Sequence, residues 1–201
     1  YYYYENGYRE SVKNYVDDIQ DGKSTRWHEN GQIWSVAYFK DDKVEGKATR
    51  WYESGEIYAQ VNYKQDKFDG KYTEWYENGQ LKTKGNYISG NKDGKSTGWH
   101  ENGQIKFKGI FKDGNLVSEI KYLYDTNGQI ILEGNYKDGK KHGKETWWNN
   151  GQISWEVYYK DGEADGKSTW WYDNGQMMIE SNHIDSKKHG KSTSWNENGQ
   201  V

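Results

Sequence analysis

The chain has 201 residues, a net charge of -3 and only 32% hydrophobic residues, and its mean hydropathy of -1.32 approaches that of disordered proteins. Its aromatic content of 17% argues against disorder, because each ring brings a large apolar surface that favours collapse. The charge gives no general attraction to nucleic acid or to an anionic membrane, and the absence of cysteine excludes disulfides and thiolate metal sites. No apolar run approaches the roughly 18 residues that a membrane helix needs, so we expect neither a nucleic-acid partner nor membrane contact through this region.

A glycine that closes an Asn-Gly-like step recurs along the whole chain. It stands at Gly7, Gly31, Gly55, Gly79, Gly103, Gly128, Gly151, Gly175 and Gly199, with spacings of 24, 24, 24, 24, 25, 23, 24 and 24 residues. A second mark, Gly-Lys, recurs at Gly22, Gly46, Gly70, Gly94, Gly143, Gly166 and Gly190 and is lost only around Ser118. This period predicts a single array of about eight units over residues 1–201, which begins and ends inside a repeat.

Residue types also recur at fixed positions around each turn glycine. In the unit around Gly103, Trp99 stands four residues before it, Ile105 two after it and Phe111 eight after it. Residues 105–111 largely alternate between apolar and polar, and residues 95–99 are rich in Thr and aromatic side chains, so both segments read as strands. Each unit is therefore predicted to be a β-hairpin.

The apolar pattern also selects a turn type. A two-residue Asn-Gly loop would pair Trp99 with Lys106, whereas a three-residue Glu-Asn-Gly loop with a left-handed glycine pairs Trp99 with Ile105. We prefer the three-residue loop because it gathers Trp, Thr, Ile and the late aromatic residue on one face, and apolar patterning fixes strand register.

Segments rich in Asp, Lys and Gly, such as residues 137–143, join successive hairpins. The simplest assembly is an all-β fold in which tandem hairpins of about 24 residues form one long, twisted antiparallel meander sheet. An irregularity is expected at residues 114–128, where the Gly-Lys mark is lost and one residue is added. It is either a local kink or a seam between two sub-arrays.

Two segments resemble MORN repeats, specifically their bacterial variant. They are Trp75-Tyr76-Glu77-Asn78-Gly79-Gln80-Leu81 and Tyr136-Lys137-Asp138-Gly139-Lys140-Lys141-His142-Gly143-Lys144. The resemblance extends over essentially the whole chain and implies a non-enzymatic scaffold for protein–protein interaction. Bacterial proteins built from the variant are often antitoxin or immunity proteins that neutralise a toxin, and others are surface-associated. Because the shared positions are structural, the resemblance assigns no functional residue.

The amino-acid bias of the chain bears on its source and its compartment. The bias towards Lys, Asn, Tyr and Ile, with arginine only at Arg9, Arg26 and Arg50, is typical of an AT-rich bacterial genome. The bacterial cytoplasm, and the cell surface or periplasm, are therefore the compartments that we expect.

No constellation of residues predicts catalysis, a cofactor or a metal. His28 and His100 occupy the same repeat position three units apart, which is too far to share a metal. Turn carboxylates such as Glu29 and Glu53 are one hairpin apart, without an obvious closed pocket for paired acid–base work. The acidic run at residues 17–22 faintly suggests calcium but lacks the ligand spacing of an EF-hand.

Aromatic residues also occupy positions that strand alternation assigns to the outer face. They are Trp34, Tyr38, Tyr52, Tyr58, Tyr72 and Tyr76 in the first half, and Trp148, Tyr158, Trp170 and Tyr172 in the second. One interpretation is that these rings support neighbouring strands through cross-strand pairs. The other is that they form a recognition surface, because Tyr and Trp supply binding area at low entropic cost.

The remaining predictions concern ligands. Between the aromatic groups, a basic stretch of Lys82, Lys84, Lys106 and Lys108 is either a solvated face or a docking site for an acidic partner. A protein partner, either a toxin or a surface protein, is the first prediction. A glycan is the alternative, because aromatic, Gly-rich repeats also occur in cell-surface carbohydrate-binding and adhesive modules. Open edge strands would also allow end-to-end self-association.

Overall fold

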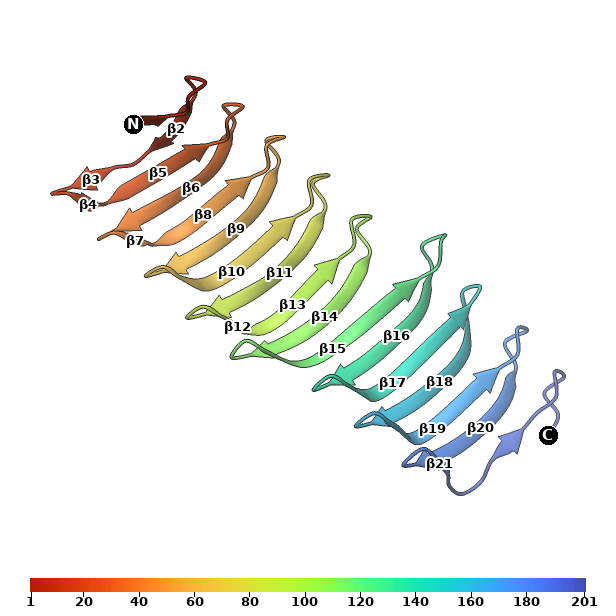
Figure 1. The fold of residues 1–201 in the computed structure, drawn as a ribbon. Helices are drawn as coiled ribbons and strands as arrows, with labels where there is room; N and C mark the ends of the chain where they lie inside the picture. The colour runs from red at the N-terminus through yellow and green to blue at the C-terminus, as the bar shows by residue number, and fades with distance from the viewer. The chain divides into compact units, whose positions relative to one another are not determined.

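The computed structural model describes all 201 residues and contains no helix. Twenty strands belong to one antiparallel sheet, and β3 (Tyr15–Val16) and β4 (Ile19–Gln20) form a separate pair. Within each of the two units described below, the strands follow one another as arched hairpins in chain order (Figure 1). The predicted fold class, an all-β antiparallel meander of tandem hairpins, is confirmed. No helix that could span a membrane is found.

The chain divides into two compact units. Unit 1 comprises residues 1–105 and 111–115, and unit 2 comprises residues 106–110 and 116–201. The irregularity expected at residues 114–128, either a kink or a seam, stays a prediction, and the two units are described separately below.

Each unit is a succession of hairpin strands. Unit 1 holds β1 (Tyr2–Tyr3), β2 (Arg9–Val12), β3, β4, β5 (Gly22–Trp27), β6 (Ile33–Lys40), β7 (Lys43–Val44), β8 (Gly46–Trp51), β9 (Ile57–Lys64), β10 (Lys67–Trp75), β11 (Leu81–Ile88), β12 (Asn91–Lys92) and β13 (Gly94–Trp99). Residues of both units contribute to β14 (Ile105–Lys112) and β15 (Asn115–Tyr124). Unit 2 continues with β16 (Ile130–Lys137), β17 (Lys140–Asn149), β18 (Gln152–Lys160), β19 (Glu163–Trp171), β20 (Met177–Ile184), β21 (Lys187–Lys188) and β22 (Thr193–Ser194).

One end of each hairpin is a wide loop that contains the turn glycine. Between β5 and β6, Gly31 has a φ of 83° and its N–H donates to the His28 carbonyl at 2.9 Å, while the His28 N–H donates to the Gln32 carbonyl at 2.7 Å. Trp27 then pairs with Ile33, which confirms the register predicted from the three-residue loop. The same pairing joins Trp51 with Ile57, Trp75 with Leu81, Tyr124 with Ile130 and Trp171 with Met177.

The hairpin of β17 and β18 closes differently. Asn150 and Gly151 have φ values of 48° and 78°, and Asn149 pairs with Gln152 across a two-residue turn. A type I′ turn needs a left-handed conformation at both central residues, which Asn and Gly tolerate best. For this hairpin the predicted three-residue loop is wrong, and the register of the strands changes with it.

The other end of each hairpin is a tight turn with left-handed non-glycine residues. Asp41 and Asp42 have φ values of 50° and 64°. The Asp42 N–H donates to the Gln20 carbonyl of the preceding repeat at 3.0 Å, and its carboxylate accepts the Gln20 N–H at 2.7 Å. Asp17 and Asp18 form the same kind of turn between β3 and β4, so the acidic run considered for calcium has a structural role here. No cluster of three or more residues that could hold a metal is present.

Register assigns each side chain to a face, because directly paired residues of antiparallel strands project to the same side. We call one side the inner face. In unit 1 it carries the pairs Ser24–Ala37 and Ala48–Val61. In unit 2 it carries a row of paired residues, Gly134, Glu145, Val157, Ser168 and Ser181. The opposite side is the outer face.

The repeated threonines lie on the outer face. Thr25 pairs with Val36, and Thr49 pairs with both Val36 and Gln60. The prediction that Thr shares a face with the late aromatic residue is therefore wrong. A bulge lies between the Trp27–Ile33 pair and the Arg26–Ser35 pair. The face that Trp27 and Ile33 share therefore does not predict the faces of the residues farther along the two strands.

Burial is shallow in both units. Only five hydrophobic residues are fully buried: Ala48, Ala59, Val61, Leu132 and Val157. Small polar residues fill other buried inner positions, including Ser24, Ser96, Ser168 and Ser181. A single sheet has no second layer to pack against, so each hairpin relies mainly on its neighbours for burial.

Candidate binding surface

A row of cross-strand pairs runs across the middle of the inner face of unit 1. In spatial order its members are Ser11, Arg26, Ser35, Arg50, Ala59, Glu74, Thr83 and Gly98. Arg26 and Arg50 flank Ser35 on either side. This central row of unit 1 is polar and charged.

The corresponding row of unit 2 is apolar. In spatial order it contains Leu123, Leu132, Trp147, Trp155, Trp170, Ile179 and Ser194. The rings of Trp147 and Trp155 stack with their centroids 5.4 Å apart and their planes at 21°. All three tryptophans are half-buried. We call Trp147, Trp155 and Trp170 the tryptophan row, and the altered register after the two-residue turn is what aligns Trp147 with the other two.

Glu74 is a buried carboxylate of the inner face of unit 1. It is 8% exposed, its Oε1 lies 2.7 Å from Lys82 Nζ, and its Oε2 accepts the Tyr72 hydroxyl at 2.7 Å. Burial and the hydrogen bond to Glu74 together raise the pKa of Tyr72 well above its usual range. The hydrogen bond to Glu74 also raises the pKa of Lys82, outweighing the opposite effect of burial.

Glu145 is a buried carboxylate of the inner face of unit 2, in a different row from that of Glu74. It is 2% exposed, and its Oε1 lies 2.7 Å from Lys141 Nζ and accepts the Trp147 Nε1–H at 3.3 Å. Burial alone would lower the pKa of Lys141, but the hydrogen bond and the charge of Glu145 raise it. Both buried carboxylates are thus held by a lysine, which is the arrangement of a structural ion pair.

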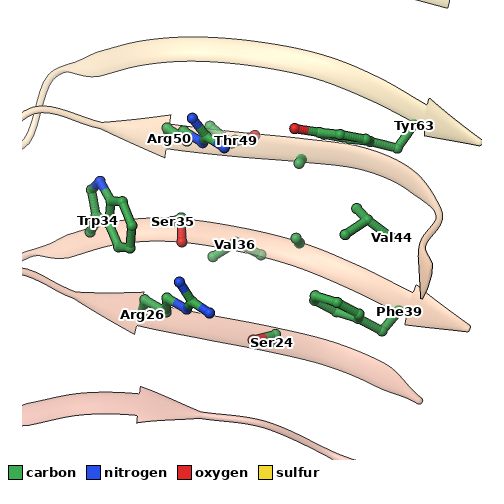
Figure 2. A pocket seen from close by; sticks show the side chains of 12 residues that line it. Ser24, Arg26, Trp34, Ser35, Val36, Phe39, Val44, Thr49, Arg50 and Tyr63 are labelled. Atoms are coloured by element: carbon green, nitrogen blue, oxygen red, sulfur yellow. The ribbon is translucent and has the colours of Figure 1, made fainter. Parts of the chain in front are cut away.

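A hollow of about 210 Å³ lies on the inner face of unit 1. Figure 2 shows Arg26, Trp34 and Arg50 at one end and Phe39, Val44 and Tyr63 at the other. The Arg26 guanidinium lies 5.6 Å from the centroid of the Trp34 ring. Neither Arg26 nor Arg50 forms an ion pair. We call this feature the arginine hollow.

Several residues predicted for the outer face lie on the inner face instead. Trp34 contacts Arg26, Tyr72 pairs with Val61, and Trp170 belongs to the tryptophan row. Tyr58 and Lys82 occupy the same repeat position as Trp34, and Lys82 reaches Glu74 of the inner face. The physical reason is the bulge after each wide loop, which adds one residue to the strand and reverses the expected alternation.

Three of the predicted binding tyrosines join successive repeats. The hydroxyl groups of Tyr52, Tyr76 and Tyr172 donate to the carbonyls of Trp75, Trp99 and Trp195 at 2.8, 2.9 and 2.9 Å. His28 occupies the same repeat position, with Nε2 3.0 Å from the Trp51 carbonyl oxygen. These contacts match the interpretation in which such rings support neighbouring strands.

The other predicted aromatic residues do not form these hydrogen bonds between successive repeats. Tyr38 and Tyr158 lie on the outer face, 49% and 43% exposed, and pair with Lys23 and Lys144. Trp148 is half-buried beside the two-residue turn, where it pairs with Ile153. A role of these residues in binding stays a prediction.

The basic stretch divides between faces. Lys84 pairs with Thr73 and Thr97 on the outer face, whereas Lys82 is engaged on the inner face, so these two lysines do not form one basic patch. In unit 2, Lys106 and Lys108 are exposed, and Lys108 Nζ lies 5.6 Å from the centroid of the Tyr122 ring.

One Ser–His contact has the composition of a nucleophile and its base. Ser168 Oγ lies 3.0 Å from His183 Nδ1 in unit 2. Ser168 is only 1% exposed, so a substrate could not reach its hydroxyl without the sheet opening. The pair is therefore a buried hydrogen bond of the inner face.

Comparison with known families matches the hairpin architecture. The MORN repeat variant matches residues 20–41, 44–65, 68–89, 92–113, 120–138 and 164–185, together more than half of the chain. The chain belongs to the MORN repeat variant family. MORN repeats are generally interaction and scaffold modules and a non-catalytic repeat type. No curated protein matches the chain.

The positions that recur in this MORN array are those that build the hairpins. The residues of the central rows differ from repeat to repeat, and sequence reasoning missed Arg26, Arg50, Trp147 and Trp155 as site residues. One signal was available, since Arg26, Arg50 and Trp170 each stand five residues before a turn glycine. Assigning that position to the inner face needs the bulge, which alternation alone does not reveal.

Proposed function

We propose that this MORN repeat protein is a non-enzymatic scaffold that binds a protein partner through its inner face. The observation that carries the proposal is the tryptophan row of unit 2, in which Trp147, Trp155 and Trp170 pair directly across three adjacent strands. Tryptophan is enriched among the residues that dominate binding energy, because a large rigid ring buries much area at low entropic cost.

The setting of the row also favours a protein ligand. Ile179 extends the apolar surface beyond Trp170, Leu132 packs beside Trp147 below the surface, and Lys141, which is paired with the buried Glu145, provides a polar group close by. A continuous apolar centre with a polar rim is the usual anatomy of a protein interface.

The finer proposal concerns the identity of the partner. The resemblance to bacterial antitoxin and immunity proteins supports a toxin as the bound protein, which this chain would neutralise by covering it. Such a partner would meet the chain in the bacterial cytoplasm or at the cell surface or periplasm.

A glycan is the second candidate ligand, because tryptophan rings on neighbouring strands can stack on sugars. Trp147 and Trp155 stack on each other, however, so one face of each indole is already occupied. This makes a protein the better-supported ligand.

Affinity capture with two matched double variants tests the proposal. Trp155→Ser/Trp170→Ser removes two rings of the tryptophan row, and Tyr38→Ser/Tyr158→Ser removes two exposed rings of the outer face. We expect wild type and the outer-face variant to capture the same protein, and the inner-face variant to lose it while keeping its circular dichroism spectrum. Capture that persists in the folded inner-face variant would contradict the proposal. A glycan array probed with the same three proteins tests the second candidate.

A further inference from the structure

The arginine hollow in unit 1 owes its space to small side chains. Its floor is formed by Ser24, Ala37 and Ala48, inner-face residues whose short side chains leave the space above them open. In β10 the equivalent position is Tyr72, which pairs with Val61 and Gly85 and packs its ring against Phe68 and Tyr87. A ring thus fills in β10 the space that stays open over β5, β6 and β8.

The walls of the hollow are apolar at one end and cationic at the other. Phe39, Val44 and Tyr63 provide the apolar end. Arg26 and Arg50 provide the cationic end and are separated by the single strand that carries Ser35, so their strands are about 10 Å apart. A ligand that fits must therefore combine an apolar group with a negative charge.

The two guanidinium groups are exposed at the hollow and are available to a negatively charged ligand. No Asp or Glu lines the hollow, and neither arginine takes part in an ion pair, whereas the buried carboxylates Glu74 and Glu145 are each paired with a lysine. Arginine recognises carboxylates through two parallel hydrogen bonds. A carboxylate is therefore the group that best complements the charge of the hollow.

The size of the hollow indicates what carries the carboxylate. At about 210 Å³ it is smaller than the roughly 300–1,000 Å³ of sites for cofactors and drug-sized molecules. It has the scale of a protein side chain, and its floor is an open sheet face rather than a closed cavity.

We propose that the arginine hollow binds an extended segment of the protein partner. In that segment an Asp or Glu lies between Arg26 and Arg50, and a neighbouring apolar side chain fills the apolar end formed by Phe39, Val44 and Tyr63. The inference rests on the proposed protein-binding function but adds a second, separate site with its own ligand chemistry in unit 1.

Selection from a phage-displayed library of random dodecapeptides tests this site directly. The bait is the full chain, as wild type, Arg26→Gln/Arg50→Gln, or Lys23→Gln/Lys47→Gln. The lysine variant is a matched control because it removes the same charge from the same two strands, β5 and β8. Lys23 and Lys47 pair with Tyr38 and Asn62 on the outer face.

We expect wild type and the lysine variant to enrich peptides with an acidic residue next to an apolar one. A selected peptide should bind the arginine variant at least about tenfold more weakly, because hydrogen bonds to charged groups contribute about 1.5–3 kcal/mol. Arg26→Lys/Arg50→Lys keeps the charge but not the planar fork, and it should restore binding only in part.

Three outcomes would overturn the inference. They are the enrichment of no peptide, the enrichment of peptides without acidic residues, and a loss of peptide affinity in the lysine variant equal to that in the arginine variant. The last outcome would indicate a general electrostatic attraction and not a specific site. Because the arginine and lysine substitutions leave the tryptophan row intact, these outcomes leave protein capture through Trp155 and Trp170 standing. Failure of that capture as well would overturn the proposed function itself.

Discussion

At the scale of single residues, the inner face buries carboxylates where a two-layered protein would bury aliphatic side chains. Glu74 and Glu145 are 8% and 2% exposed, and each is held by a lysine of its own unit. In unit 2 a bulge in β17 lies between the Gly134–Glu145 and Tyr136–Lys141 pairs. It shortens the distance along β17, so that the Lys141 side chain reaches Glu145, four residues later in the chain. A buried charge without its partner is costly, so these lysines are essential to local stability.

The first prediction concerns the Glu145 ion pair. Lys141→Ala should lower the free energy of unfolding by about 2–3 kcal/mol, somewhat less than for a fully buried pair because the Lys141 side chain is 37% exposed. Lys167→Ala is the control, since its partner Glu180 is 35% exposed, and it should cost about 1 kcal/mol or less. Urea unfolding measures both, and equal losses in the two variants would show that burial of Glu145 is not the cause.

The second prediction is a loss of stability in alkali. Tyr72 has a raised pKa in the folded chain, so in the unfolded chain it ionises first, above its ordinary value of 10.0, and stability falls as pH rises past that point. Lys82 acts in the same direction, because its stabilising charge is fully present below its unfolded pKa and is lost as pH rises through its raised folded pKa.

Urea midpoints at pH 8 and pH 11 check this effect. The drop between the two values should be smaller in Tyr72→Phe than in wild type, while Tyr158→Phe, which changes an exposed outer-face tyrosine, should behave as wild type. An unchanged drop in Tyr72→Phe would contradict the role given to Tyr72.

At the scale of the elements, an asparagine ladder joins successive wide loops. The Asn30 side chain accepts the Gln32 N–H at 2.9 Å and donates to the Glu53 carbonyl of the next loop at 2.8 Å. Asn6, Asn78 and Asn174 make the equivalent bonds to the next loop. Ser54 stands at this position in the loop of Gly55 and interrupts the ladder.

The third prediction follows from that interruption. Ser54→Asn should raise the free energy of unfolding by about 1 kcal/mol by adding the hydrogen bond to the Glu77 carbonyl. Ser54→Ala is the control and should be close to neutral. Thermal unfolding compares the two, and an asparagine that stabilises no more than alanine would argue against the ladder.

The elements also show where sequence reasoning succeeds and where it stops. The turn glycines and the pairing of Trp27 with Ile33 follow from periodicity, because a left-handed position and an apolar pair are both visible in the sequence. The faces of Trp34 and Trp170 do not follow, because alternation assumes an unbroken pleat and each bulge reverses it. The two-residue turn at Asn150 was equally hidden, since the same Asn-Gly step occurs in most of the wide loops.

At the scale of the whole molecule, the residues that build the hairpins recur from repeat to repeat, whereas the residues of the central rows vary. The turn glycines, the tyrosines that join repeats and the asparagine ladder recur in both units. The central rows do not: unit 1 places Arg26 and Arg50 where unit 2 places Trp170 and other apolar residues. A frame of this kind lets individual inner-face positions set ligand chemistry without altering the hairpins, which is consistent with a scaffold for protein interaction.

The central claim is that the inner face, and not the outer face, meets the partner. Hydroxyl-radical footprinting of the captured complex tests it at the level of side chains. We expect oxidation of Trp155 and Trp170 to fall on binding while that of Tyr38 and Tyr158 stays unchanged. Protection of Tyr38 and Tyr158 with undiminished oxidation of Trp155 and Trp170 would contradict the account.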